Sequence, residues 1–181
     1  HRRLVLLRGS PQGLGVGVNS LKSNHDVPVW QSSFPVSWND SFQLGYAPMD
    51  SIHEQFVSIV ARLQIAVAAD QALVMDELLD HTREHFEVEN KWMHETAFPP
   101  RDCHIEQHEA VLTSIIEVRT LIDQGRHDVC RSLAHALADW FPVHATHLDS
   151  ALAHWMFKRK FNGKPLILHR RSTAEAARIS A

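Results

Sequence analysis

The stretch His85-Phe86-Glu87-Val88-Glu89 carries the clearest structural signal in this 181-residue chain. A helix returns to the same face after four residues, so His85 and Glu89 point the same way if the stretch is helical. An imidazole beside a carboxylate on one face is either a pair of metal ligands or an ion pair. Taken alone, such a pair is most often ordinary surface, so its meaning depends on the rest of the chain.

The rest of the chain repeats this arrangement. His104 and His108 are four residues apart, and His144 and Asp149 are five apart. His53 stands near the start of an earlier apolar helical pattern. Fourteen histidines in a chain with one Tyr and two Cys are an excess, and imidazole is the commonest metal ligand, so the composition indicates a metal site.

Apolar residues at three- and four-residue spacing predict four helices, over about 50–69, 71–95, 102–124 and 127–158. Leu73 is predicted to face inward on the second helix. Gly125 is predicted to end the third helix in a left-handed conformation. Pro142 falls inside the fourth and is expected to kink it just before His144. We therefore predict an all-α fold, an antiparallel up-down-up-down four-helix bundle with a non-helical N-terminal arm.

The chain divides by composition into a glycine-rich leader that is flexible or unassigned (1–36), the bundle (37–158) and a basic C-terminal tail (159–181). A net charge of −3 offers no basic patch for nucleic acid. No apolar run approaches the ~20 residues that span a bilayer. The two cysteines would lie at opposite ends of the bundle, so we expect reduced thiols and a cytoplasmic location.

With alternating helix directions, all seven polar groups reach the same end of the bundle. Buried and unpaired, each charge would cost several kcal/mol. A metal centre removes this difficulty, but seven ligands are too many for one tetrahedral zinc. They suit two bridged ions, and imidazole favours iron over magnesium or calcium. The candidate ligands are His53, His85, Glu89, His104, His108, His144 and Asp149.

This ligand series resembles the signature of the hemerythrin family. The flanking residues that resemble its bacterial members are Leu44-Gly45, Met49-Asp50, Trp92-Met93 and Trp140. The resemblance implies a non-haem di-iron centre in which His104, His108 and His144 hold one iron. His53 and His85 would hold the other iron, which keeps an open position. Glu89 and Asp149 would bridge the two irons together with an oxo or hydroxo group.

The resemblance also implies the function: reversible dioxygen binding for carriage, storage, delivery or sensing, without enzymatic catalysis. A protein partner for dioxygen delivery is not identified by the sequence. Two alternatives stay open at this point. One is a di-iron oxidase, a peroxidase-like protein or a nitric oxide-handling enzyme on the same scaffold. The other is a sensing or iron-handling module.

Overall fold

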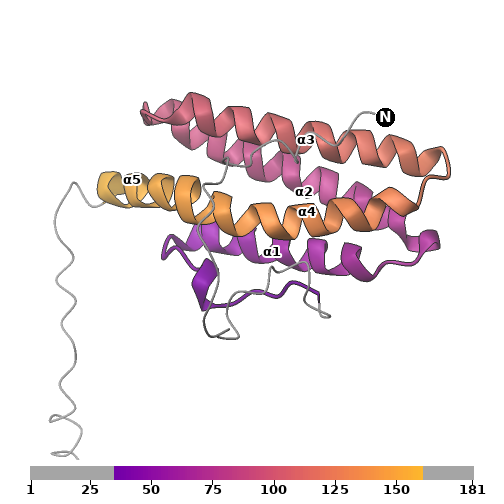
Figure 1. The fold of residues 1–181 in the computed structure, drawn as a ribbon. Coiled ribbons are helices and arrows are strands. Elements are labelled where there is room, and N and C mark those ends of the chain that lie inside the picture. The colour runs from indigo at the N-terminus through magenta and orange to yellow at the C-terminus, as the bar shows by residue number, and fades with distance from the viewer. Residues whose placement is uncertain (1–34, 161–181) are drawn as a thin grey trace, which may run out of the picture.

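The computed structural model describes residues 35–160, and these form a helical bundle (Figure 1). The four long helices are α1 (Ala47–Ile65), α2 (Ala68–Glu95), α3 (Arg101–Asp123) and α4 (Asp128–His144). A π-helical turn, η4 (Ala145–Asp149), then joins α4 to α5 (Ser150–Lys160). No strand occurs within residues 35–160. The predicted all-α up-down-up-down bundle is therefore confirmed, whereas the leader up to residue 34 and the tail from residue 161 lie outside the described residues.

Short connections set the antiparallel order of the helices. Gly125 follows the end of α3 with a φ of +79°, the left-handed conformation predicted for it. Its N–H donates to the carbonyl of Ile122, and the N–H of Arg126 donates to that of Leu121, both at 2.9 Å. These bonds satisfy carbonyls that the end of a helix leaves free.

The bundle interior is apolar along most of its length. Ile115, Leu133 and Leu137 are completely buried between the helices. The prediction that Leu73 faces inward is wrong, because its side chain is 72% exposed and Val74 takes the inward position. Leu73 precedes the buried Leu78 by five residues, which turns it about 140° away around the helix.

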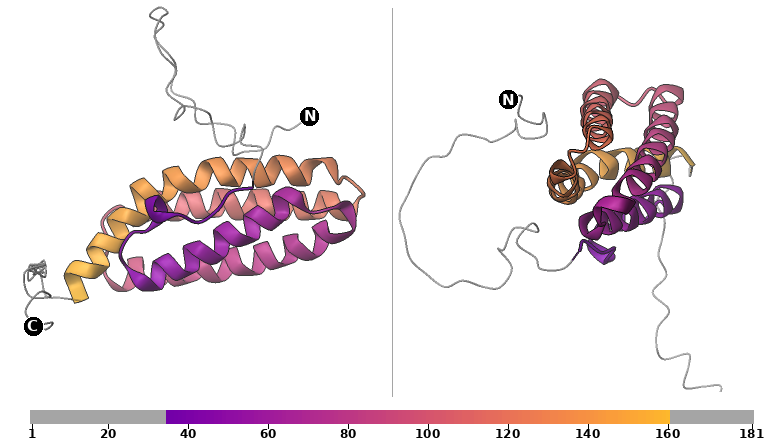
Figure 2. Two further views of the ribbon diagram at one scale, coloured as in Figure 1. Left: turned by 90° about the horizontal axis from the view of Figure 1, so that it is seen from below. Right: turned by 90° about the vertical axis from the view of Figure 1, so that its right-hand side faces the viewer.

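The N-terminal arm before α1 lies along α1 and α4, as Figure 2 shows. The N–H of Val36 donates to the side-chain oxygen of Gln64 at 2.7 Å. The arm contains the short 3-10 helix η3 (Asp40–Phe42), and the ring centroid of Phe42 lies 5.5 Å from that of Phe141 in α4. The arm is therefore packed on the bundle, as its aromatic content indicates.

The first turn of α1 is fixed by Asp50, whose carboxylate accepts the N–H groups of Leu44 and Gly45 at 2.7 and 3.0 Å. Gly45 has a φ of +80°, a conformation that suits glycine. This turn sets the position of His53, which lies one helical turn further along.

Candidate metal centre

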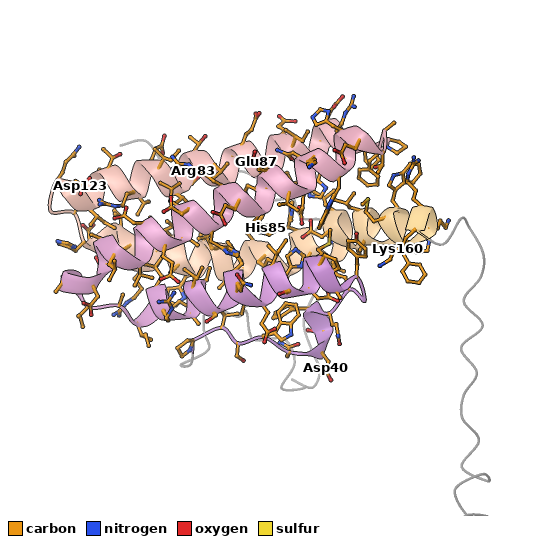
Figure 3. All side chains as sticks on the ribbon, turned by 180° about the vertical axis from the view of Figure 1, so that it is seen from behind. Asp40, Arg83, His85, Glu87, Asp123 and Lys160 are labelled. Atoms are coloured by element: carbon orange, nitrogen blue, oxygen red, sulfur yellow. The ribbon has the colours of Figure 1, made fainter. Side chains whose placement is uncertain are left out.

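The structure brings all seven predicted side chains together inside the bundle, and none is more than 3% exposed. Figure 3 shows His85 between the helices, whereas Asp123 and Lys160 lie at opposite ends of the molecule. The side chains form two groups. Within each group, all the potential ligand atoms lie within 4.8 Å of one another. One group is Glu89, His104, His108, His144 and Asp149, and the other is His53, His85 and Glu89.

Glu89 belongs to both groups because its two oxygens face different histidines. Oε1 lies 3.1 Å from Nε2 of His85 and 3.6 Å from Nε2 of His53. Oε2 lies 3.3 Å from Nε2 of His108 and 3.6 Å from Nε2 of His104. One carboxylate therefore reaches both halves of the cluster.

Asp149 has the same relation to the two halves. Its Oδ2 lies 3.2 Å from Nε2 of His53. Its Oδ1 lies 3.0 Å from Nε2 of His104 and 3.1 Å from Nε2 of His144. Glu89 and Asp149 thus stand between a three-histidine half and a two-histidine half.

The π-helical turn explains why His144 and Asp149 share a face at a spacing of five residues. The N–H of Ser150 donates to the carbonyl of Ala145, which is the five-residue bond of a π-helix. An α-helix would turn residues five apart about 140° from each other. This turn follows His144 directly, and Pro142 lies inside α4, where the kink expected from it stays a prediction.

The donor atoms fit a metal better than they fit one another. Nε2 of His144 lies 3.1 Å from Nε2 of His104 and 3.2 Å from Nε2 of His108, so three ring nitrogens converge on one point. Among the described residues, several buried atoms of the cluster have no hydrogen-bond partner, including Nε2 of His53 and both carboxylate oxygens of Asp149. A shared cation would satisfy these lone pairs.

Two amide side chains hold the outer faces of the histidines. Nδ1 of His108 faces Oδ1 of Asn90, and Nδ1 of His144 faces Oε1 of Gln107, each at 3.2 Å. An Nδ1–H donated to an amide oxygen leaves the Nε2 lone pair free for a metal. Sequence reasoning missed Asn90 and Gln107. The available signal was only that each directly adjoins a predicted ligand, Glu89 or His108.

Comparison with known proteins agrees with this geometry. The family described as Hemerythrin HHE cation binding domain matches residues 44–155. The chain belongs to the hemerythrin family. A bacteriohemerythrin from Ralstonia nicotianae is 32% identical over 124 residues, which cover 68% of this chain and 90% of that protein.

Two further hemerythrin relatives are less similar in sequence. A bacteriohemerythrin from Stenotrophomonas maltophilia is 28% identical and covers 64% of this chain and 78% of its own length. A myohemerythrin from Sipunculus nudus is 25% identical and covers 64% of this chain and 88% of its own length. Over residues 35–160, no helix of this hemerythrin combines the length and apolar content needed to cross a membrane.

The charges of the hemerythrin cluster are set by burial and by mutual contact. Burial opposes ionisation of Asp149, but His144, His104 and His53 hold the pKa of that carboxyl well below its usual range. Burial alone would lower the pKa of His53, whereas the two carboxylates in contact with it raise that pKa to about 9. Burial lowers the pKa of His108 to about 4. Without metal, a protonated His53 therefore faces the carboxylates, and a metal cation would take over its charge.

Aromatic rings enclose the cluster. Phe86 stacks on His108 with a centroid distance of 3.8 Å, and Trp140 stacks on His144 at 4.3 Å. Phe141 meets His53 edge-on at 5.2 Å. These rings hold the imidazoles in place and keep bulk water away from them.

Proposed function

We propose that this hemerythrin holds two iron ions through the seven clustered side chains and binds dioxygen reversibly. The observation that supports this proposal is that the five imidazoles are divided unequally between the two sides of the carboxylates. Three imidazole nitrogens lie on one side and two on the other. Glu89 and Asp149 each direct one carboxylate oxygen to the first side and the other oxygen to the second side. The side with His53 and His85 has one protein donor fewer.

The missing donor is the reason for proposing a ligand site on that side. Octahedral ions of this type take six ligands. Five protein donors face the three-histidine side and four face the His53 and His85 side, so the latter keeps one more position that no protein atom fills. When bound, a pair of iron ions would supply that open position and two electrons for dioxygen.

The surrounding residues support reversible binding. Five imidazoles bind a metal in their neutral form, and two carboxylates offset part of the cationic charge. Phe56, Phe86 and Phe141 are buried and lie beside His53 and His85. Their apolar surfaces exclude water from the face of these histidines that they cover, which favours ligand binding over substrate chemistry.

The test is the optical spectrum of the iron-loaded chain, reduced without air, then exposed to air and degassed again. We expect colour that appears with dioxygen and disappears on degassing, at two irons per chain. Glu89→Gln should lose iron, whereas Glu87→Gln on the exposed face of α2 should behave like the parent. Colour that forms once and cannot be reversed, or steady turnover of peroxide, would replace this proposal with an oxidase or a peroxidase-like activity.

The physiological use of the bound dioxygen, whether carriage, storage, delivery or sensing, stays a prediction. So does the cytoplasmic location. Cys103 and Cys130 are free thiols, a state that suits a reducing compartment.

A further inference from the structure

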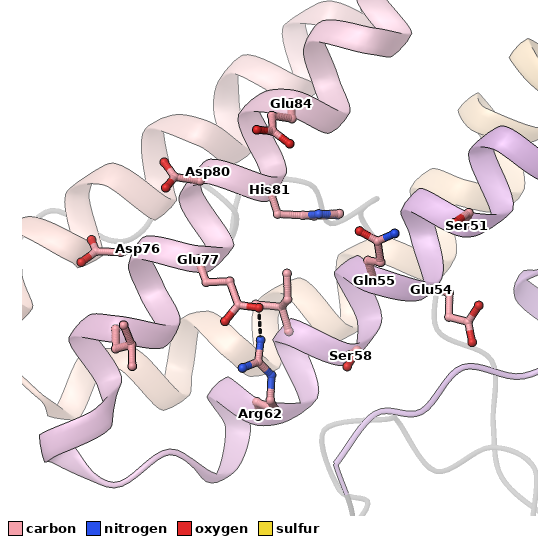
Figure 4. A pocket seen from close by; sticks show the side chains of 12 residues that line it. Ser51, Glu54, Gln55, Ser58, Arg62, Asp76, Glu77, Asp80, His81 and Glu84 are labelled. Atoms are coloured by element: carbon pink, nitrogen blue, oxygen red, sulfur yellow. Dashed lines mark hydrogen bonds and ion pairs between the residues drawn. The ribbon is translucent and has the colours of Figure 1, made fainter.

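A large groove runs between α1 and α2 on the surface of the bundle (Figure 4). Its volume is about 880 Å³. Figure 4 shows Gln55 of α1 and His81 of α2 projecting into the space between the two helices. In this groove the side chains of α1 and α2 do not fill the space between the two helices near their middle.

A smaller pocket of about 130 Å³ continues from this groove toward the metal cluster. The two hollows share Gln55, His81 and Glu84 as lining residues. The smaller one is also lined by His85, a proposed ligand on the side with the open position. The surface groove thus leads to the half of the centre where a small ligand would bind.

The opposite side of that half is closed by aromatic packing. Phe56 and Phe86 are each 1% exposed, and their ring centroids lie 6.2 and 5.1 Å from that of His85. Phe141 is 2% exposed and closes the space beside His53. A molecule approaching through the core would have to displace these rings, whereas the groove is open to the surface.

His81 stands at the junction between the groove and this aromatic wall. Its ring centroid lies 5.9 Å from that of His85 and 6.4 Å from that of Phe56. Its Nε2 atom is buried and has no hydrogen-bond partner among the described residues. A backbone hydrogen bond with Ile52 holds the ring, so His81 lines the passage in a fixed position.

The groove also carries a net negative charge. Its lining contains five carboxylates and one guanidinium. Glu77 is paired with that guanidinium, Arg62, while Asp76 and Asp80 are paired with Arg119 and Arg83 outside the lining. The carboxylates are Glu54, Asp76, Glu77, Asp80 and Glu84. Such a field repels small anions before they reach the interior, but has little effect on an uncharged diatomic molecule.

We infer that the groove between α1 and α2 is the route by which small molecules reach the His53 and His85 side, with His81 lining its inner end. The carboxylates around the groove make this route select neutral molecules over anions. The inference rests on the proposed function, because it presumes a ligand site at the di-iron centre.

The route is tested by stopped-flow association of dioxygen with the reduced iron-loaded chain and of azide with the oxidised chain. Gln55→Trp narrows both hollows from an exposed position, and Gln124→Trp at the far end of α3 is the matched control. A barrier along this route slows association and dissociation by the same factor, about tenfold for 1.4 kcal/mol. The equilibrium affinity for azide, the iron content and the spectrum should stay unchanged.

The charge selection is tested with Asp80→Asn combined with Glu84→Gln. This variant should speed azide association by roughly tenfold at low salt, flatten its dependence on ionic strength, and leave dioxygen association unchanged. The control removes two exposed carboxylates of α3 through Glu109→Gln and Glu117→Gln.

The outcomes separate this inference from the function on which it rests. Unchanged association rates in Gln55→Trp, with two irons and a reversible spectrum, would overturn the route and leave the proposed function standing. Azide rates that rise equally in the α3 control would overturn the charge selection. A parent chain that binds no iron, or shows no reversible spectrum, would overturn the proposed function and the route together.

Discussion

Nδ1 of His108 lies 3.2 Å from the side-chain oxygen of Asn90, a residue of the neighbouring helix α2. The same imidazole is stacked flat on Phe86, with an angle of 1° between the ring planes. The hydrogen bond fixes the rotation of the ring, and the stacking fixes its tilt. His108 therefore presents Nε2 to the centre without the loss of conformational freedom that an unsupported side chain would suffer.

Removing that support should weaken metal binding. We expect Asn90→Ala to lower iron affinity by about 10- to 100-fold, the usual effect of losing an outer partner of a metal-binding histidine. Asn90→Asp keeps an acceptor oxygen and should retain most of the affinity. The measurement is iron retained against a competing chelator. Equal retention by the parent and Asn90→Ala would show that the hydrogen bond does not position the ring.

The seven side chains that cluster in the bundle could be predicted from the sequence, but the residues that support them could not. His85 and Glu89 repeat a helical period, so residue type and spacing were sufficient. Asn90 and Gln107 act across helix boundaries, on His108 and His144. Their roles depend on how adjacent helices are rotated, which no local spacing encodes.

The π-helical turn and Leu73 show the same limit for the fold. Four helices and their order follow from apolar periodicity, but a five-residue turn after His144 departs from that period. Leu73 is apolar, yet the rotation of α2 about its axis is set by Val74, Met75 and Leu78, and this leaves Leu73 in solvent. The hydrophobicity of a single residue therefore predicts its burial less well than its position relative to all the apolar residues on the same helix.

The contrast between a buried and an exposed leucine gives a stability prediction. Leu137→Ala should lower the free energy of unfolding by about 3 kcal/mol, because Leu137 is completely buried and its loss leaves a cavity. Leu73→Ala should change it by less than about 0.5 kcal/mol. Urea unfolding of both variants in the same metal state measures the difference. Similar losses in the two variants would contradict the observed rotation of α2.

The left-handed conformation of Gly125 gives a second stability prediction. A Cβ atom added there meets no other atom within 4 Å, so the cost of Gly125→Ala is backbone strain alone. We expect a loss of about 1 kcal/mol, seen as a lower thermal midpoint. Gly125→Asn should lose less, because asparagine tolerates this conformation better. Equal midpoints for the Ala and Asn variants would argue against strain at this position.

Metal uptake should release a proton from His53. In the metal-free chain the carboxylates raise the pKa of His53 to about 9, so the ring is protonated at neutral pH, yet an imidazole must be neutral to bind a metal. Metal affinity should therefore rise with pH by about tenfold per unit from this proton, and level off above that pKa. His108, whose pKa is lowered to about 4, is already neutral and contributes nothing in this range.

Anaerobic Fe(II) titration calorimetry in two buffers of different ionisation enthalpy measures the release of this proton. His53→Gln should abolish it while the three-histidine side still binds metal, and the exposed control His154→Gln should keep it. An affinity that stays flat between pH 7 and 8.5, with no proton released, would mean that the carboxylates do not hold His53 in its charged form.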